Sequence, residues 1–147
     1  MEYQNKNYLI STEKSKINVA LVHNYLCYHS YWAEGIPLEV VQRSIQNSLC
    51  FAMYKSDEQI GFARVISDFA TYAYLADVFI VPEERGKGLS KWLMRVIMNH
   101  PQLQGLRRFV LATKDAHGLY AQFGFTAYPN PDRLMTIGYS EIYKGLK

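Results

Sequence analysis

The sequence lacks the features that mark several classes of protein. It holds only two cysteines, Cys27 and Cys50, and neither has metal-ligand spacing to other residues. We therefore expect two reduced, buried thiols and no metal, as in a cytoplasmic protein. No stretch approaches the ~20 apolar residues that a membrane span requires, and the N-terminus has no apolar signal core. The sequence predicts a soluble protein with no membrane partner.

The sequence also has little net charge. The 16 Lys and Arg residues barely outnumber the 13 Asp and Glu residues, and the longest basic block is the pair Arg107-Arg108. Surfaces that bind nucleic acid are more basic than this, so no nucleic-acid partner is expected. The sequence has no linker, repeat or low-complexity segment, and we expect residues 1–147 to form one domain with a sizeable core.

Apolar periodicity predicts alternating strands and helices. Helical spacing predicts helices over residues 16–29, 37–49, 88–100 and 115–123. Apolar runs bounded by turn residues predict strands over residues 8–11, 50–55, 59–66, 72–81, 107–113, 125–128 and 134–138. This order indicates a single α/β or α+β domain with a mixed sheet.

A glycine-rich loop joins the long apolar strand to the helix that follows it. The loop reads Arg85-Gly86-Lys87-Gly88-Leu89-Ser90. Its glycines permit positive φ angles, so consecutive N–H groups at the helix N-terminus can point at one phosphate or pyrophosphate. The loop is neither a P-loop nor a dinucleotide fingerprint, since Lys91 stands where the latter has its third glycine. A plain strand-to-helix turn is the simpler alternative, but it needs neither two glycines nor three cations.

Two stretches together resemble one family. Residues Val81-Pro82-Glu83-Glu84, continued by the glycine loop, resemble the acetyl-CoA-binding motif of the GNAT N-acetyltransferase superfamily. Residues Leu119-Tyr120-Ala121-Gln122-Phe123-Gly124-Phe125 resemble its second signature. The expected element order is similar to that family's fold along nearly the whole chain. The resemblance implies a mixed, mostly antiparallel central sheet of six to seven strands with about four helices on its two faces.

The resemblance also implies acetyl-CoA as cosubstrate. The loop would cradle the pyrophosphate, and the strand before it would pair its backbone with the pantetheine arm. The sequence departs from the family pattern at Ser90, which replaces a Gly or Ala, and at Thr113, where many members have Asn. The cofactor-binding residues implied are Phe79, Ile80, Val81, Arg85, Gly86, Lys87, Gly88, Leu89, Ser90 and Lys91.

Tyr120, in the second signature, is the expected general acid. Attack of an amine on a thioester expels a thiolate, which a nearby phenol can protonate. The alternative is a core tyrosine without a catalytic role. His117, three residues earlier, can share a helical face with Tyr120, as a proton acceptor or as an ordinary solvated residue.

Asp77 interrupts the apolar strand at 72–81 and is the second catalytic candidate. Strand alternation would place its carboxylate on the face of Leu75 and Phe79. There it would take a proton from a cationic substrate amine, or hold the ammonium group. The alternative is a structural ion pair, with Arg64 as partner.

Aromatic residues are expected to line the acceptor site. Tyr31 and Trp32 fall between the first two helices, and Tyr72 and Tyr74 lie at the start of the long strand. Aromatic walls beside a carboxylate suit an organic ammonium, although core packing is an equally good explanation. The sequence thus predicts direct acetyl transfer to a primary amine of a small molecule or protein, in a monomer or homodimer. The alternative is a non-catalytic acyl-CoA sensor or interaction module.

Overall fold

The fold is a six-stranded sheet with helices on both faces. The computed structural model describes residues 1–139 and 141–144. The strands are β1 (Glu2–Asn5), β2 (Tyr8–Ser11), β3 (Leu49–Lys55), β4 (Glu58–Ser67), β5 (Tyr72–Ile80) and β6 (Arg108–Leu111). The helices are α1 (Val19–His29), α2 (Leu38–Gln46), α3 (Leu89–Met98) and α4 (His117–Ala121), with short 3-10 turns η1 (Lys14–Lys16), η2 (Pro82–Glu84), η3 (Pro101–Leu103) and η4 (Pro131–Arg133).

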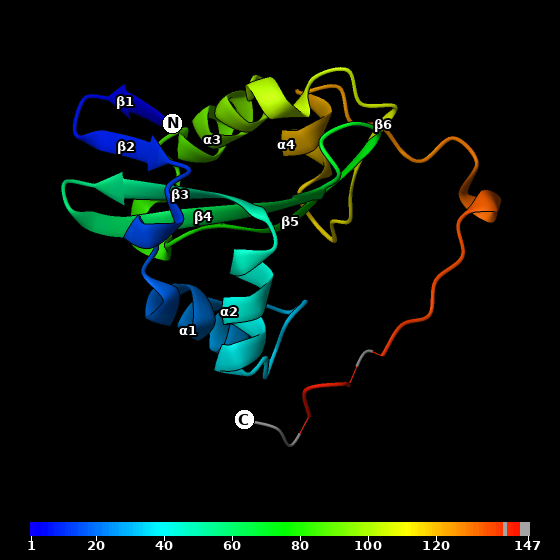
Figure 1. Cartoon of the computed structure of the whole chain (residues 1–147), viewed down its shortest axis with the longest axis horizontal. Helices are drawn as coiled ribbons and strands as arrows, with labels where there is room; N and C mark the ends of the chain where they lie inside the picture. The colour runs from blue at the N-terminus through cyan, green and yellow to red at the C-terminus, as the bar shows by residue number, and fades with distance from the viewer. Residues whose placement is uncertain (140, 145–147) are drawn as a thin grey trace.

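The strands lie in chain order across the sheet, β1-β2-β3-β4-β5-β6. All neighbouring strands are antiparallel except β5 and β6, which are parallel. Helices α3 and α4 cover one face of the sheet, and α1 and α2 cover the other (Figure 1). This is the mixed, mostly antiparallel sheet that the sequence predicts.

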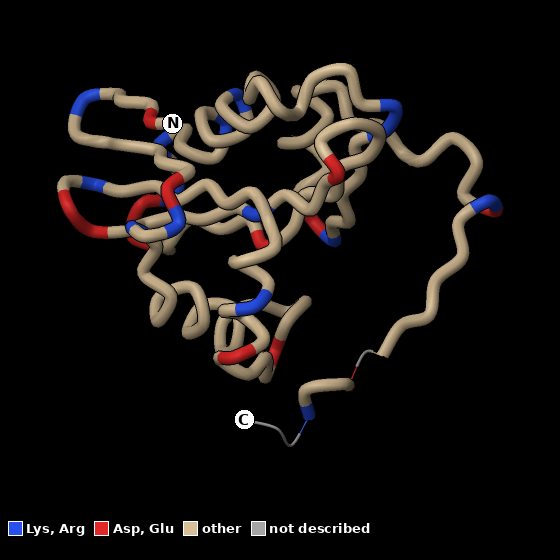
Figure 2. The backbone as a smooth tube through the Cα atoms, viewed as in Figure 1, with Lys and Arg blue, Asp and Glu red and all other residues tan. Residues whose placement is uncertain are grey.

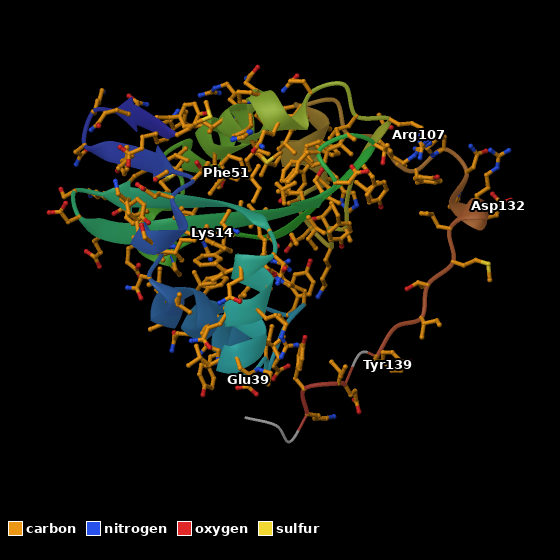
Figure 3. All side chains as sticks on the ribbon, in the orientation of Figure 1. Lys14, Glu39, Phe51, Arg107, Asp132 and Tyr139 are labelled. Carbon is orange, nitrogen blue, oxygen red and sulfur yellow. The ribbon has the colours of Figure 1, made fainter. Side chains whose placement is uncertain are left out.

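Each face of the sheet carries its own hydrophobic core. One core packs α3 against residues such as Phe51 and Leu75, and the other packs α1 and α2 against Phe62 and Phe79. Phe51 is completely buried beneath α3 (Figure 3). Both cysteines are free and buried, as expected, and burial raises the pKa of the Cys50 thiol to about 11.

A bulge interrupts β5 at Asp77. The register between β4 and β5 shifts there, and Asp77 has a φ of 55°, in the left-handed region that Asp tolerates better than most residues. The extra residue reverses the alternation, so Leu75 and Phe79 belong to the cores on opposite faces. The expectation that Asp77 shares one face with both is therefore wrong, because the bulge breaks the two-residue period.

The C-terminal region departs from the sequence-based expectation. Residues 125–128 and 134–138 do not join the sheet, although both were expected to be strands, because neither has a strand partner within the described chain. After η4, residues 134–139 form an extended C-terminal arm that stands away from the body (Figure 1). The β1–β2 hairpin includes a strand that the polar sequence did not reveal, and α4 is shorter than expected.

Within the described ranges, every helix is too short or too polar to cross a membrane. The same residues contain no group of three or more His, Cys, Asp or Glu side chains placed to hold a metal ion. Lys and Arg are scattered among Asp and Glu along the backbone rather than gathered on one element (Figure 2).

Candidate active site

The site begins where β5 and β6 part. The two strands pair only from Tyr72, opposite Arg108, to Leu75, opposite Leu111. Beyond the bulge, residues 78–80 continue along β4, and the described residues place no strand on their other side. Val81 N–H donates to the Ile60 carbonyl on β4 at 2.9 Å, so strand alternation turns the peptide groups of Ile80 toward the open side. This leaves an open strand edge directly before the glycine loop.

The glycine loop carries the chain from that edge into α3. Gly86 and Gly88 have φ angles of 78° and 77°, which L-residues rarely adopt. A Cβ built on either glycine would meet no atom within 4 Å, so the space above the loop is open. Among the described side chains none caps α3, and its first backbone bond runs from Trp92 N–H to the Gly88 carbonyl. The N–H groups of the first turn are therefore free to bind an anion.

The cations of the loop differ in what they contact. Arg85 donates from Nε to the Ile80 carbonyl at 2.9 Å and from Nη2 to the Tyr25 hydroxyl at 2.8 Å. Lys87 Nζ pairs with Glu84 Oε1 at 3.0 Å. Lys91 is exposed on the first turn of α3. Arg85 and Lys87 thus brace the loop, and Lys91 is the cation best placed to meet a ligand.

Glu84 connects the loop to the sheet. Its buried carboxylate also accepts from the Tyr8 hydroxyl at 3.0 Å and pairs with Lys55 Nζ at 3.3 Å. The hydrogen bond from Lys87, supported by those from Tyr8 and Lys55, holds the pKa of the Glu84 carboxyl below its ordinary value. A charged Glu84 therefore fixes the end of η2, from which the loop starts.

The apolar residues expected at the cofactor site point into the cores. Phe79, Ile80 and Leu89 are each at least nine-tenths buried, and Val81 packs against both cores. Only their backbone groups face the open edge and the loop. Phe79 stacks on Tyr25 with ring centroids 4.0 Å apart, so Tyr25 supports both the strand and Arg85.

A cavity of about 420 Å³ lies where the open edge of β5 faces α4. It brings together five residues predicted from the sequence, which are Tyr31, Trp32, Tyr74, Asp77 and Tyr120. Tyr72, which was also considered, is not part of this wall. The aromatic and acidic groups expected at an acceptor site are therefore gathered around one hollow.

Tyr120 lies on α4 and is 9% exposed. Burial, together with the nearby Tyr31 and Asp115, raises the pKa of its phenol. The phenol therefore stays protonated at neutral pH, which is the state a proton donor needs. Its ring packs edge-on against Phe125, with centroids 6.1 Å apart.

Asp77 uses both carboxylate oxygens. Oδ2 accepts from Arg64 Nε at 2.8 Å, and Oδ1 accepts from Trp32 Nε1 at 2.8 Å. Arg64 also donates to the Ser48 hydroxyl at 3.1 Å. The ion pair considered from the sequence is thus present, and it anchors the Trp32 indole at the mouth of the cavity.

Several residues of the cavity were missed. The Nζ atom of Lys114 lies 5.3 Å from the centre of the Tyr31 ring, and the backbone N–H of Lys114 donates to the Tyr31 hydroxyl at 3.0 Å. Asp115 and Ala116 also line this cavity. Thr113 Oγ1 accepts from Ala116 N–H at 3.0 Å and so shapes the turn into α4. The polar run Thr113-Lys114-Asp115 after an apolar strand was the available signal. His117 is exposed and lies outside this cavity.

Comparisons with known proteins find relatives in both sequence and fold. The model of the acetyltransferase (GNAT) family matches residues 19–125. A crystal structure of a GNAT-family protein from Xanthomonas campestris shares 50% identity, covers 96% of this chain and 99% of its own, and has a TM-score of 0.93. An uncharacterised N-acetyltransferase of Gracilaria tenuistipitata is 30% identical over 75% of this chain and 71% of its own.

A more distant structure shares the fold alone. It is a Clostridium acetobutylicum acetyltransferase solved with acetyl-CoA, 16% identical, with a TM-score of 0.68 over 90% of this chain and 95% of its own.

The role of Glu84 can be tested by acidification. A carboxyl whose pKa is lowered in the folded state adds stability above its ordinary pKa of 4.5, and this stability is lost as pH falls through the folded pKa. We expect the melting temperature of Glu84→Gln to fall less than that of the wild type between about pH 5 and about pH 3. The exposed neighbour Glu83 provides the control, since Glu83→Gln should keep the wild-type slope. Equal slopes for all three proteins would contradict this role.

Proposed function

Because the chain belongs to the GNAT acetyltransferase family, we propose that it is an acetyl-CoA-dependent N-acetyltransferase. It moves an acetyl group directly from CoA to a primary amine of a small molecule or protein. The observation that carries this proposal is the meeting of three features at one place. The open edge of β5, the empty space above the glycine loop and the cavity beside Tyr120 adjoin one another.

The residues present fit acetyl-CoA. The backbone N–H groups of Gly86, Gly88 and the first turn of α3 bind the pyrophosphate, and Lys91 adds charge at the rim. The open edge at residues 78–80 flanks the pantetheine arm as a neighbouring strand would, with the Ile80 carbonyl already accepting from Arg85 Nε. Arg85 and Lys87 act indirectly, because they hold the loop through Ile80, Tyr25 and Glu84.

When bound, acetyl-CoA supplies an activated acyl thioester. The open N–H of the Phe79–Ile80 segment donates to the developing oxyanion, and strand alternation favours Ile80 for this role. The neutral amine forms the new N–C bond as the C–S bond breaks. Tyr120 gives its phenolic proton to the departing sulfur and regains one from solvent, while the acetylated nitrogen releases its surplus proton to water.

Asp77 acts mainly as a positioning residue. Both oxygens of its carboxylate are already engaged, one by Arg64 and the other by Trp32. It orients the indole beside Tyr31, and these aromatic faces hold the cationic amine before that amine loses a proton. The proposed amine site thus consists of the Tyr31 and Trp32 rings, with the Asp77–Arg64 ion pair holding the indole in place.

Binding and turnover test the proposed activity separately. At ~100 times the Kd, acetyl-CoA should stabilise the folded chain by about 2.7 kcal/mol and raise its melting temperature by several degrees. NAD and ATP should not. CoA release in a screen of amines, with mass spectrometry of the product, then identifies the acceptor. No shift at saturating acetyl-CoA contradicts the proposal, whereas a shift without CoA release for any amine supports an acyl-CoA sensor.

Tyr120→Phe should lower kcat by about 100-fold or more, with little change in the affinity for acetyl-CoA. The ring keeps its packing, and only the proton donor is lost. Tyr72→Phe is the matched control, because Tyr72 is an exposed tyrosine outside the cavity. Steady-state kinetics paired with the thermal shift make the measurement. Unchanged turnover in Tyr120→Phe would remove this phenol from the chemistry.

Asp77→Asn separates the two roles open to this carboxylate. As a positioning residue it should raise KM for the amine by about 10-fold and leave the acid limb of the kcat–pH profile in place. As a general base it would lower kcat and abolish that limb. Trp32→Phe, which removes the indole donor to Asp77 but keeps an aromatic ring, should reproduce part of the KM effect. A kcat defect without a KM change would reject positioning.

A further inference from the structure

Two charged residues of the acceptor cavity have no ionic partner among the described residues. The charged side chains that line the cavity are Asp77, Lys114 and Asp115. Asp77 is neutralised by Arg64. Lys114 and Asp115 are exposed, and no ion pair of the described chain includes either of them, not even one between the two. The cavity therefore presents one unpaired charge of each sign, on neighbouring residues.

The Lys114 ammonium is positioned by contacts with Tyr31. Its Nζ lies 5.3 Å from the centre of the Tyr31 ring, and the backbone N–H of Lys114 donates to the Tyr31 hydroxyl at 3.0 Å. Tyr31 thus already has a cation over its ring. A substrate ammonium placed there would meet a like charge, whereas a substrate anion would meet an unpaired cation. This part of the cavity therefore favours an acidic group.

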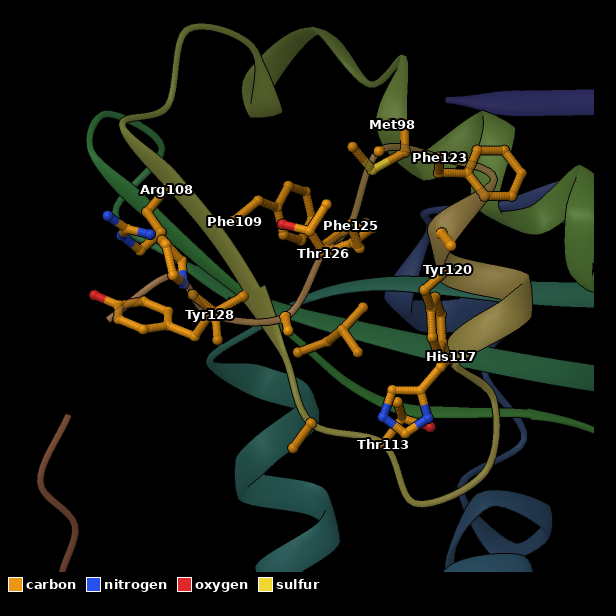
Figure 4. A pocket seen from close by; sticks show the side chains of 17 residues that line it. Met98, Arg108, Phe109, Thr113, His117, Tyr120, Phe123, Phe125, Thr126 and Tyr128 are labelled. Atoms are coloured by element: carbon orange, nitrogen blue, oxygen red, sulfur yellow. The ribbon is translucent and has the colours of Figure 1, made fainter. Parts of the chain in front are cut away.

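Asp115 lies near the reaction centre. Figure 4 shows the chain leaving Thr113, passing through the loop that carries both charged residues and entering α4, where Tyr120 follows. Burial and Tyr31 are the larger causes that raise the pKa of the Tyr120 phenol, and the Asp115 charge adds to them. The Asp115 carboxylate is therefore close to the proposed proton donor, and a free carboxylate there can bind an ammonium group.

We propose that the acceptor is a small amine that also carries an acidic group, either a carboxylate or a phosphate. Lys114 binds the acidic group, and Asp115 holds the ammonium end near Tyr120. This inference rests on the proposed acetyl transfer and adds the class of acceptor to it. Amino acids and amino phosphates have both charges. Polyamines have charges of one sign only and would bring a second cation to Lys114.

The same two charges distinguish the acceptor from its product. Acetylation turns the amine into a neutral amide, while the acidic group keeps its charge. The product therefore loses its attraction to Asp115 and retains only its contact with Lys114. We expect the acetylated compound to bind more weakly than the acceptor, which favours its release after transfer.

Binding to the complex with CoA tests the inference without turnover, because CoA carries no acetyl group. Isothermal titration calorimetry compares amines that differ by one acidic group. Leucine with isopentylamine and phenylalanine with phenethylamine test a carboxylate, and phosphoethanolamine with ethanolamine tests a phosphate. The wild type should bind the acidic member of at least one pair about 5-fold more tightly. This preference should shrink at ~0.5 M salt, because the charges involved are exposed.

Variants assign the preference to its residue. Lys114→Gln should remove the preference, and Lys114→Glu should reverse it in favour of the plain amine. Asp115→Asn should weaken both members of a pair by a similar factor, since both carry the ammonium group. Lys6→Gln is the matched control, because Lys6 is an exposed lysine outside the cavity. All three positions are exposed, so the variants should keep the wild-type circular dichroism.

A wild type that prefers the acidic member in no pair, or binds neither member of any, would overturn the inference. A preference that survives Lys114→Glu would do the same. CoA release from acetyl-CoA separates this inference from the proposed function. Release without a preference would reject acid recognition and leave the acetyl transfer standing. A preference without release would support acid recognition and reject acetyl transfer to the bound amine.

Discussion

The bulge at Asp77 is the constraint on which the site depends. Without the extra residue, β5 could run beside β6 for its full length, and its edge would be closed by backbone hydrogen bonds. With it, pairing to β6 ends at Leu75 and an unpaired edge continues to Ile80. The residue that causes the break also keeps its side chain at the break, where Arg64 and Trp32 bind it. Backbone geometry and acceptor-site chemistry therefore have one origin.

Backbone and side chains perform different tasks around this opening. The loop and the strand edge offer peptide groups to a ligand, while their side chains are turned into the cores or engaged in Glu84 and Tyr25 contacts. The acceptor cavity works in the opposite way, because ring faces and hydroxyl groups supply its walls. In the proposed function, the loop and strand edge hold the cofactor through backbone groups, and the side chains of the cavity select the acceptor.

Much of this could be predicted from the sequence because the relevant signals are local. The glycines at 86 and 88, the helical stripe of α3 and the alternating strands need only neighbouring residues to be recognised. That Leu75 and Phe79 point to opposite faces of the sheet could not be predicted, because a bulge inside a uniformly apolar strand does not change the sequence pattern. The contacts of Arg85 with Tyr25 and of Lys114 with Tyr31 join residues far apart in the chain, and no pattern announces them. Residues 125–128 and 134–138 have strand composition but pair with no strand of the described chain. Composition alone does not predict which strand, if any, such a segment will pair with.

The open space above Gly86 and Gly88 has a consequence for how this chain can change over evolutionary time. An anion held by peptide N–H groups is indifferent to the side chains carried by those peptides. The side chains along the loop can therefore change over time without loss of anion binding, provided that the left-handed backbone at the two glycines is kept. Selection acts here on conformation, so divergence in side-chain identity along the loop is a poor guide to divergence in function.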